Sequence, residues 1–420
     1  MQTASNRHLW SVVAIAAVHG LVHAFSIFLS PLNDEIRRYF LADSVATITA
    51  FKSTYLITYA ASNLFFGFMT NRISARRTLS VGLAVNGVAI ACFAFVPPSG
   101  AGLMHALWLL AAVGGGVYHP VANVLITRLF PEGKGRVIGF TGTGAAVGFA
   151  LGPLLTTGLT AAFGLDWQSV ALIFGLFGVL ASIWVYATVQ DAERAIPQQA
   201  RAARAAGDAG AAGAAGVAPT PAAAAGLKAI AGVLVAVVVI AGTREMAMWS
   251  VLDISDFFLL RLLEGPGYTG FYLFLLYVPG IIVQPLAGGL SDAIGRRWLA
   301  TAAFVIYGAS VAAVGVLPPA IVFLAYLGMG VGQAASIPTI EAFVADVAGP
   351  ELRGAAYGVF FTAGIALGAL GPGGAGLMID TLGGGLDAFR LVFAFLGGAV
   401  LIAACFIPRF IATRADARRA

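Results

Sequence analysis

The pentapeptide Pro131-Glu132-Gly133-Lys134-Gly135 recurs 219 positions later as Pro350-Glu351-Leu352-Arg353-Gly354. With the same offset, Gly139 corresponds to Gly358, Gly152 to Gly371, and Pro153 to Pro372. Each match is a short basic turn or a Gly-Pro step between long apolar runs. Two similar membrane-embedded halves in one polypeptide are a common architecture of secondary transporters, whose substrate site lies between the halves.

The composition predicts a membrane protein. Hydrophobic residues make up 59% of the 420 positions, charged residues make up 10%, and the mean hydropathy is +0.90. A run of about 18 or more apolar residues with few charges predicts a transmembrane helix. Twelve such runs occur, over residues 9–30, 46–69, 78–96, 102–127, 137–163, 169–189, 228–250, 268–290, 298–317, 319–344, 354–380 and 388–408. They lack the alternation of β-barrel strands, so we expect an all-α membrane fold in the lipid bilayer.

The positive charges predict the orientation of these helices. If the N-terminus is cytoplasmic, the loops and termini on that side hold 18 of the 24 Lys and Arg residues. Because cytoplasmic loops are enriched in Lys and Arg, we expect both termini inside. The net charge of +5 is then explained by the basic cytoplasmic loops. The sequence has no basic patch with interleaved aromatic residues that would predict nucleic-acid binding. The first run lacks a signal-peptide cleavage pattern. The Ala- and Gly-rich composition suggests a bacterial chain, so we expect the bacterial cytoplasmic (inner) membrane.

One segment interrupts the apolar pattern. Residues 191–227 begin with mixed charges and become rich in Ala and Gly. Such a sequence cannot bury a core and predicts a flexible cytoplasmic linker. Six apolar runs precede it and six follow. The expected domains are therefore six-helix bundles over 1–190 and 228–420.

A loop in the second half resembles a known signature. Gly288-Gly289-Leu290-Ser291-Asp292-Ala293-Ile294-Gly295-Arg296-Arg297 is similar to the G-x-L-[AS]-D-x-x-G-R-R motif of the major facilitator superfamily. The first-half copy starts at Gly67 and has Asn71 and Ser74 in place of the Asp and the second Gly. The resemblance extends over nearly the whole chain. It implies twelve helices as two six-helix pseudo-repeats, a small-molecule substrate and a monomer.

Shorter stretches resemble particular branches of that superfamily. His19 followed by Pro31, and Tyr118-His119-Pro120, are similar to the fosmidomycin-resistance type of efflux transporter. Four positions after His19, where that type leads us to expect an acidic residue, this chain has His23. The Gly-Pro stretch over residues 148–158 resembles the fifth-span signature of antiporters. This likeness slightly favours efflux.

Two sets of residues are candidates for conformational control. Asp292 is an anion next to a helix start, and Gly288, Arg296 and Arg297 complete its loop. An acid that pairs with the other half can lock one state, although simple anchoring of the loop by its positive charges is an alternative. The steps Gly152-Pro153 and Gly371-Pro372 lie in spans with glycines about four residues apart. This pattern predicts close helix packing, a hinge between the halves, or both.

The seventh span carries charges at membrane depth. Such charges are costly and mark functional sites by default. Arg244 and Glu245 are adjacent, so they should point about 100° apart and pair poorly with each other. Glu245, Trp249, Asp253 and Asp256 follow at helical spacing and should form one stripe facing a wet cavity. We expect Arg244 and Glu245 to bind substrate or proton, or else to form structural salt bridges with another helix.

Other intramembrane candidates are more scattered. Glu341, in the tenth span, is either a proton carrier or an interfacial carboxylate. Lys52 lies early in the second span, and we expect it to extend outward toward the membrane surface; pointing inward, it would add positive charge to the vestibule. Tyr55 and Trp249 are candidate substrate contacts, although aromatic residues in membrane helices more often serve packing.

Three histidines form the last candidate group. His19 and His23 are four residues apart and share a helix face. The resemblance implies that His119 in the fourth span reaches the same cavity. Three imidazoles there could carry protons because histidine titrates near neutral pH, bind an anion, or bind a metal. Hydrogen bonding between helices is the structural alternative for each.

These observations predict a proton-coupled secondary transporter of a small organic solute, anionic or zwitterionic, working by alternating access. Uptake of a carboxylate metabolite by symport and transport of a metal or metal chelate through His19, His23 and His119 are alternatives. A sensor on a transporter fold is another. The sequence has no G-x-x-x-x-G-K-[ST] motif, so we do not expect direct use of ATP. It also has no protease or hydrolase motif that would predict an enzyme. We expect no cofactor.

Overall fold

The computed structural model describes residues 2–69, 73–130, 134–190, 221–265 and 268–411, and these ranges contain helices and turns but no strand. The first half consists of α1 (Gln2–Ile27), α2 (Asn33–Tyr39), α3 (Val45–Met69), α4 (Ala75–Ala91), α5 (Ala101–Gly116), α6 (Tyr118–Leu129), α7 (Lys134–Phe163) and α8 (Trp167–Thr188), with 3₁₀ turns η1 (Ser30–Leu32) and η2 (Cys92–Phe95). The second half consists of α11 (Pro221–Leu263), α12 (Thr269–Ile294), α13 (Arg296–Val314), α14 (Val322–Gly368), α15 (Leu370–Thr381) and α16 (Leu386–Phe410).

These helices match the predicted membrane runs. Eleven candidate spans in the described ranges are long and apolar enough to cross a membrane. The remaining run coincides with α3, a 25-residue helix that lies beside α5 and α15. Large apolar side chains point outward, including Leu180, Leu286 and Ile402, each more than 60% exposed. An apolar exterior of this kind fits lipid rather than water, and the chain is a multi-pass membrane protein.

The element boundaries differ from the prediction in three places. The fourth span is divided into α5 and α6, and the helical assignment of α14 continues through the expected turn between spans ten and eleven. Helix α11 already begins at Pro221, so the last seven residues of the expected 191–227 linker are helical. The linker residues 191–220 and Asn71 lie outside the described residues.

The two copies of the signature loop start the next helix differently. In the second half, Gly295 has a φ of 97° between α12 and α13, a backbone conformation that glycine adopts without steric cost. In the first half, Ser74 occupies the equivalent position with a φ of −68°, and its side chain accepts a hydrogen bond from the backbone N–H of Arg77. A serine N-cap therefore replaces a glycine turn.

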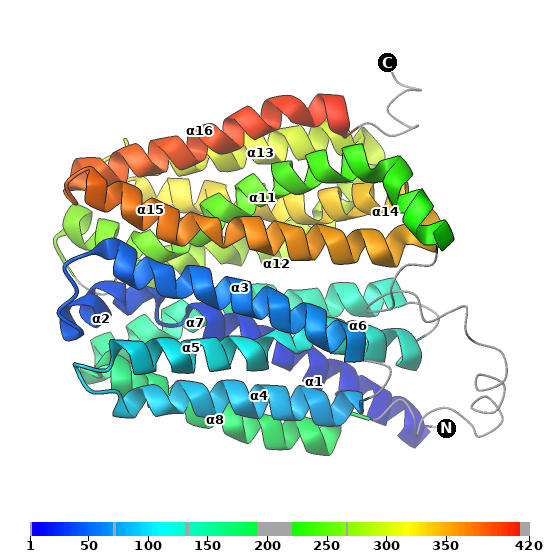
Figure 1. The fold of residues 1–420 in the computed structure, drawn as a ribbon, viewed down its shortest axis with the longest axis horizontal. Helices are drawn as coiled ribbons and strands as arrows, with labels where there is room; N and C mark the ends of the chain where they lie inside the picture. Colours follow the sequence, from blue (N-terminus) through cyan, green and yellow to red (C-terminus); the bar gives the residue numbers. More distant parts are fainter. Residues whose placement is uncertain (1, 70–72, 131–133, 191–220, 266–267, 412–420) are drawn as a thin grey trace.

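The halves lie against each other along two joints. In Figure 1 the first-half helices fill the lower part of the view and the second-half helices the upper part. Helices α7 and α12 form one joint, and α3 and α15 form the other. The start of α1 and the end of α16 lie at the right, which we call the terminal end. Helix α2 lies at the left, and we call that side the α2 end.

The predicted close packing of small residues is present within each half. A Cβ added to Gly148 of α7 would overlap the carbonyl oxygen of Gly20 in α1. A Cβ on Gly371 of α15 would overlap the carbonyl oxygen of Met246 in α11. Glycine lets these backbones touch, as small residues do in membrane helix pairs. The hinge role of Gly152-Pro153 and Gly371-Pro372 stays a prediction.

Candidate functional site

The three predicted histidines converge on the face of the first half. His19 and His23 come from α1 and His119 from α6. One ring nitrogen of each lies within 4.8 Å of those of the other two. The ring centroids are 4.9 Å apart for His19–His23, 5.0 Å for His19–His119 and 5.5 Å for His23–His119. The i, i+4 spacing in α1 places two imidazoles on one face, and the packing of α6 against α1 adds the third.

Aromatic rings surround this histidine cluster. Tyr118 stacks on His19 with centroids 4.4 Å apart, and Phe149 of α7 stacks on His23 at 4.2 Å. His19 Nδ1 lies 2.8 Å from the carbonyl oxygen of Thr141. Because a carbonyl only accepts, Nδ1 must carry the proton, which leaves the lone pair on Nε2. His19 Nε2 is buried and has no hydrogen-bond partner among the described residues.

A charged cluster occupies the facing side of the second half. Arg244 of α11 is 5% exposed, and its Nη1 donates to Ser336 Oγ of α14 at 2.7 Å. Its Nη2 forms an ion pair with Glu245 Oε1. We expected these neighbours to pair poorly, and that expectation was wrong. The Cβ directions do differ, but both side chains are long enough to bend toward each other. Arg244 Nε is buried without a hydrogen-bond partner in the part of the chain described.

Further polar groups from other second-half helices complete the charged cluster. Glu341 of α14 lies close enough to Arg244 and Glu245 to interact with both electrostatically. Tyr307 of α13 also lies within electrostatic range of the Arg244–Glu245 pair. The Tyr307 hydroxyl is a second buried polar atom without a hydrogen-bond partner in the described ranges. One guanidinium therefore serves two carboxylates among aromatic rings.

Phe149 connects the histidine cluster to the second half. Besides stacking on His23, it stacks on Tyr277 of α12, with centroids 4.6 Å apart and planes inclined by 9°. Its centroid lies 6.2 Å from that of Trp249 in α11. Trp249 follows Glu245 by one helical turn, so a single aromatic layer separates the histidines from the charged cluster.

The C-terminal part of the predicted stripe on α11, Asp253 and Asp256, lies in surroundings that differ from those expected. Asp253 and Asp256 are each 2% exposed and do not face a wet cavity. The carbonyl oxygen of Asp253 accepts from Asn33 Nδ2 at 2.8 Å, and Asp256 Oδ2 accepts from the backbone N–H of Asp34 at 2.9 Å. Thr269 Oγ1 donates to Asp256 Oδ1 at 3.0 Å. The stripe continues into this region because α11 extends to Leu263 and packs against η1 and α2 of the first half.

Lys52 does not extend outward as expected. It is 4% exposed, and its Nζ donates to the carbonyl oxygen of Ser26. The ammonium lies over the rings of Tyr55 and Trp108, at 5.5 and 5.0 Å from their centroids. Both rings therefore offer the ammonium cation–π contacts. Tyr55 is thus a packing partner of Lys52 rather than a wall of the histidine cluster.

Asp380, at the end of α15, was missed by the sequence analysis. Its carboxylate accepts from Ser44 Oγ at 2.6 Å and from the backbone N–H groups of Val45 and Ala46 at 3.0 and 2.9 Å. It therefore caps the start of α3 from the opposite half, where a carboxylate is also favoured by the helix dipole. From the sequence, Ser44 could be recognised as a residue type that caps helix N-termini. Its pairing with Asp380 could not be recognised, because no local sequence pattern connects the two positions.

The ion pairs of the signature loop at the terminal end lie within the second half, among the described residues. Asp292 is 69% exposed at its side chain, and its Oδ1 lies 3.1 Å from Nη2 of Arg296, the first residue of α13. Arg296 also pairs with Asp346 of α14, and the Arg297 guanidinium lies over the Trp298 ring at 4.8 Å. The pairing of Asp292 with the other half is not formed in this conformation among the described residues. Its role as a latch stays a prediction.

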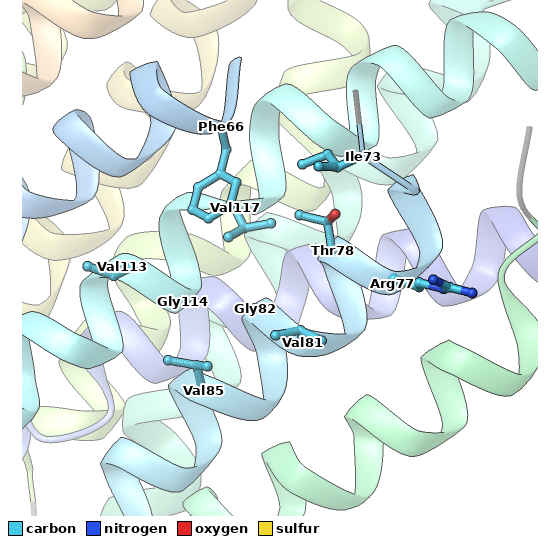
Figure 2. Close-up of a pocket in the computed structure, with 10 residues that line it drawn as sticks. All are labelled: Phe66, Ile73, Arg77, Thr78, Val81, Gly82, Val85, Val113, Gly114 and Val117. Carbon is cyan, nitrogen blue, oxygen red and sulfur yellow. The ribbon is translucent and has the colours of Figure 1, made fainter. Parts of the chain in front are cut away.

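The cavity in Figure 2 is separate from both clusters. It has a volume of about 280 Å³ and is formed by α3, α4, α5 and the residue between α5 and α6. Its walls are mostly apolar, with four valines, and Val81 and Val113 are exposed on the lipid-facing surface. Arg77 points away from the other lining side chains. An open, largely apolar groove of this kind suits a lipid chain better than a charged solute.

Comparisons with known proteins agree with the fold described above. The family model of the Major Facilitator Superfamily matches residues 12–275 and 234–419. An uncharacterized MFS-type transporter of Mycobacterium tuberculosis is 34% identical over 143 residues, which are 33% of this chain and 24% of that protein. The match thus spans about a quarter of the relative's length.

Solved structures show the same fold. A bacterial homolog of the human lysosomal transporter Spinster, in an inward-facing and unoccupied conformation, superposes with a TM-score of 0.78. It is 15% identical, and the match covers 96% of this chain and 98% of that one. A D-xylose–proton symporter gives a TM-score of 0.75 at 14% identity, covering 96% and 98%. The likeness concerns the fold alone.

Proposed function

Since the chain belongs to the major facilitator superfamily, we propose that it carries a small organic anion or zwitterion across the membrane together with a proton, by alternating access between its two halves. The charged cluster supports this proposal, and one observation carries it. Arg244 is a buried guanidinium of the second half that interacts with both Glu245 and Glu341, and its Nε has no hydrogen-bond partner among the described residues.

Arg244 is suited to bind a carboxylate. Its guanidinium is planar, always charged, and recognises carboxylates through paired N–H donors. Nη1 and Nη2 are engaged by Ser336 and Glu245. The substrate must therefore displace Glu245 or approach through Nε, and a desolvated site makes that exchange energetically significant.

The Arg244–Glu245 ion pair determines the direction of coupling. When Glu245 is ionised it competes with an anionic substrate for Arg244, and when it is protonated Arg244 is released. Proton and anion then strengthen each other's binding by the same factor, as linkage requires. This favours symport, and so uptake under an inward proton gradient, over the efflux that the fifth-span resemblance favoured.

The α2 end supports alternating access. Hydrogen bonds from Asn33 and Asp34 to the α11 aspartates, and from α3 to Asp380, join the halves on that side. These contacts must break when that end opens. In the proposed cycle these contacts hold the α2 end closed while a substrate enters or leaves at the terminal end, which the predicted topology places in the cytoplasm.

Transport in proteoliposomes with a trapped pH dye tests the proposal. A panel of organic carboxylates is applied to wild type, Glu245→Gln, Arg244→Ala and Arg244→Lys, with Arg390→Ala as a control because Arg390 pairs with the exposed Asp387. We expect substrate and protons to move in the same direction in wild type and in the control. Glu245→Gln should retain substrate movement without protons. Arg244→Ala should lose both, and Arg244→Lys should retain part.

Two outcomes would contradict the proposal. Movement of protons in the direction opposite to the substrate would establish antiport and would favour the efflux hypothesis instead. Unchanged transport in Arg244→Ala would exclude Arg244 as the anion site.

A further inference from the structure

We propose that His19, His23 and His119 bind one divalent transition-metal ion on the face of the first half. This inference goes beyond the proposed function, since it concerns a different set of side chains and does not depend on the role of Arg244. The observation behind it is convergence: ring nitrogens from two helices lie within 4.8 Å of one another. Ligand nitrogens around a tetrahedral Zn²⁺ are about 3.3 Å apart, given Zn–N distances of about 2.0–2.1 Å. Small side-chain rotations close the difference.

The orientation of His19 is that of a metal ligand. Its Nδ1 donates to the carbonyl oxygen of Thr141 at 2.8 Å, and its Nε2 is buried without a hydrogen-bond partner in the described part of the chain. Metal-ligating histidines almost always donate their second ring N–H to a carbonyl or carboxylate, which fixes the tautomer. A buried imidazole nitrogen with a free lone pair is otherwise costly. The carbonyl oxygen of Thr141 thus holds the His19 ring with Nε2 free to bind the proposed metal ion.

The surroundings select the class of ion. The walls are the rings of Tyr118 and Phe149, with Tyr59 6.3 Å from His119. Imidazole donors suit Zn²⁺, Cu²⁺, Ni²⁺ and Co²⁺, whereas Mg²⁺ and Ca²⁺ prefer oxygen ligands. Three protein ligands leave a fourth position for water or an anion. The cluster faces the aromatic layer of Phe149 and Tyr277, so that position lies toward the space between the halves.

The alternative is that the three imidazoles hold protons or an anion and no metal. Packing three rings within 5.5 Å of one another disfavours having more than one of them charged. A single metal ion satisfies all three lone pairs at once. The two hypotheses differ in the ligand that the histidines bind, so a direct measurement of metal binding distinguishes them.

The experiment uses the full chain in lipid nanodiscs with any affinity tag removed. Isothermal titration with Zn²⁺ is compared among wild type, His19→Asn, His23→Asn and His119→Asn. His105→Asn is the matched control, because His105 lies in the same half but contacts Thr54 and Phe51 instead. We expect one Zn²⁺ per chain, at least about a 100-fold loss of affinity in each cluster variant, and no loss in the control. Mg²⁺ should not compete.

A second measurement uses wild type alone, so it does not depend on whether any variant folds. X-ray absorption of Zn²⁺ bound to wild type should show three imidazole nitrogens, and Co²⁺ should give the intense visible absorption of a tetrahedral centre. The proposal is overturned if the absorption spectrum shows an oxygen-only shell. It is also overturned if His105→Asn weakens binding as much as the cluster variants, or if wild type binds no Zn²⁺.

Discussion

The two halves share a fold but present opposite chemistry to each other. The first half contributes histidines and aromatic rings, from His19, His23, His119 and Phe149. The second half contributes a guanidinium with two carboxylates, from Arg244, Glu245 and Glu341. The duplication therefore preserved the backbone arrangement while the side chains between the halves diverged. The candidate site is asymmetric, and each half can be tested separately.

The difference extends to how each half packs internally. In the first half, Gly148 lies directly on the backbone of Gly20. The position 219 residues after Gly148 is Leu367, whose side chain fills the space over Gly242 of α11. One half thus brings two backbones together, and the other fills the corresponding space with a leucine.

The largest expected effect comes from forcing the packing of the second half onto the first. Gly148→Leu should prevent α1 and α7 from packing, because even a Cβ overlaps the Gly20 carbonyl oxygen. Overpacking typically costs about 1–3 kcal/mol and more where backbones must move. We expect little folded protein by size-exclusion chromatography. Gly142→Leu is the control, since no atom lies within 4 Å of a Cβ there. Equal yields of both variants would contradict the close approach.

An intermediate effect is expected at the joint between the halves. Asp380→Asn removes a charge that accepts three hydrogen bonds at the start of α3. Hydrogen bonds to charged groups contribute about 1.5–3 kcal/mol, so the equilibrium should shift at least about tenfold toward an open α2 end. Faster amide hydrogen exchange over residues 44–53 would report this opening.

The control for that measurement lies close by in the sequence. Asp387→Asn removes an exposed carboxylate that pairs with Arg390 in the same helix. It should leave exchange over residues 44–53 unchanged. If Asp380→Asn behaves in the same way, Asp380 does not hold the halves together.

The smallest effect is expected at the signature loop. Asp292→Asn makes the second copy resemble the first, which has Asn71. Because the Asp292–Arg296 pair is exposed and Arg296 retains Asp346, the loss of stability should stay below about 1 kcal/mol. Thermal unfolding should shift by no more than about 4 °C. A loss of transport without a loss of stability would instead reveal the latch in another conformation.

Much of the site could be anticipated from residue types and spacing. The histidines at positions 19 and 23 share a face because a helix repeats every 3.6 residues. Arg244, Glu245 and Glu341 stood out because charges are rare at membrane depth. The choice between the outward and the inward position of Lys52, and the pairing of Arg244 with Glu245, could not be decided from sequence, because they depend on neighbours that are distant in sequence or on how a long side chain bends.

Sequence alone determined that this is a duplicated, multi-pass membrane protein, because hydropathy and repeat spacing are properties of the linear chain. Tertiary structure decided which candidates meet. It joined His119 to His19 and His23, brought Glu341 to Arg244, and placed Asp380 on the start of α3. Those contacts link residues up to 336 positions apart. They follow from how the helices pack, which no local pattern records.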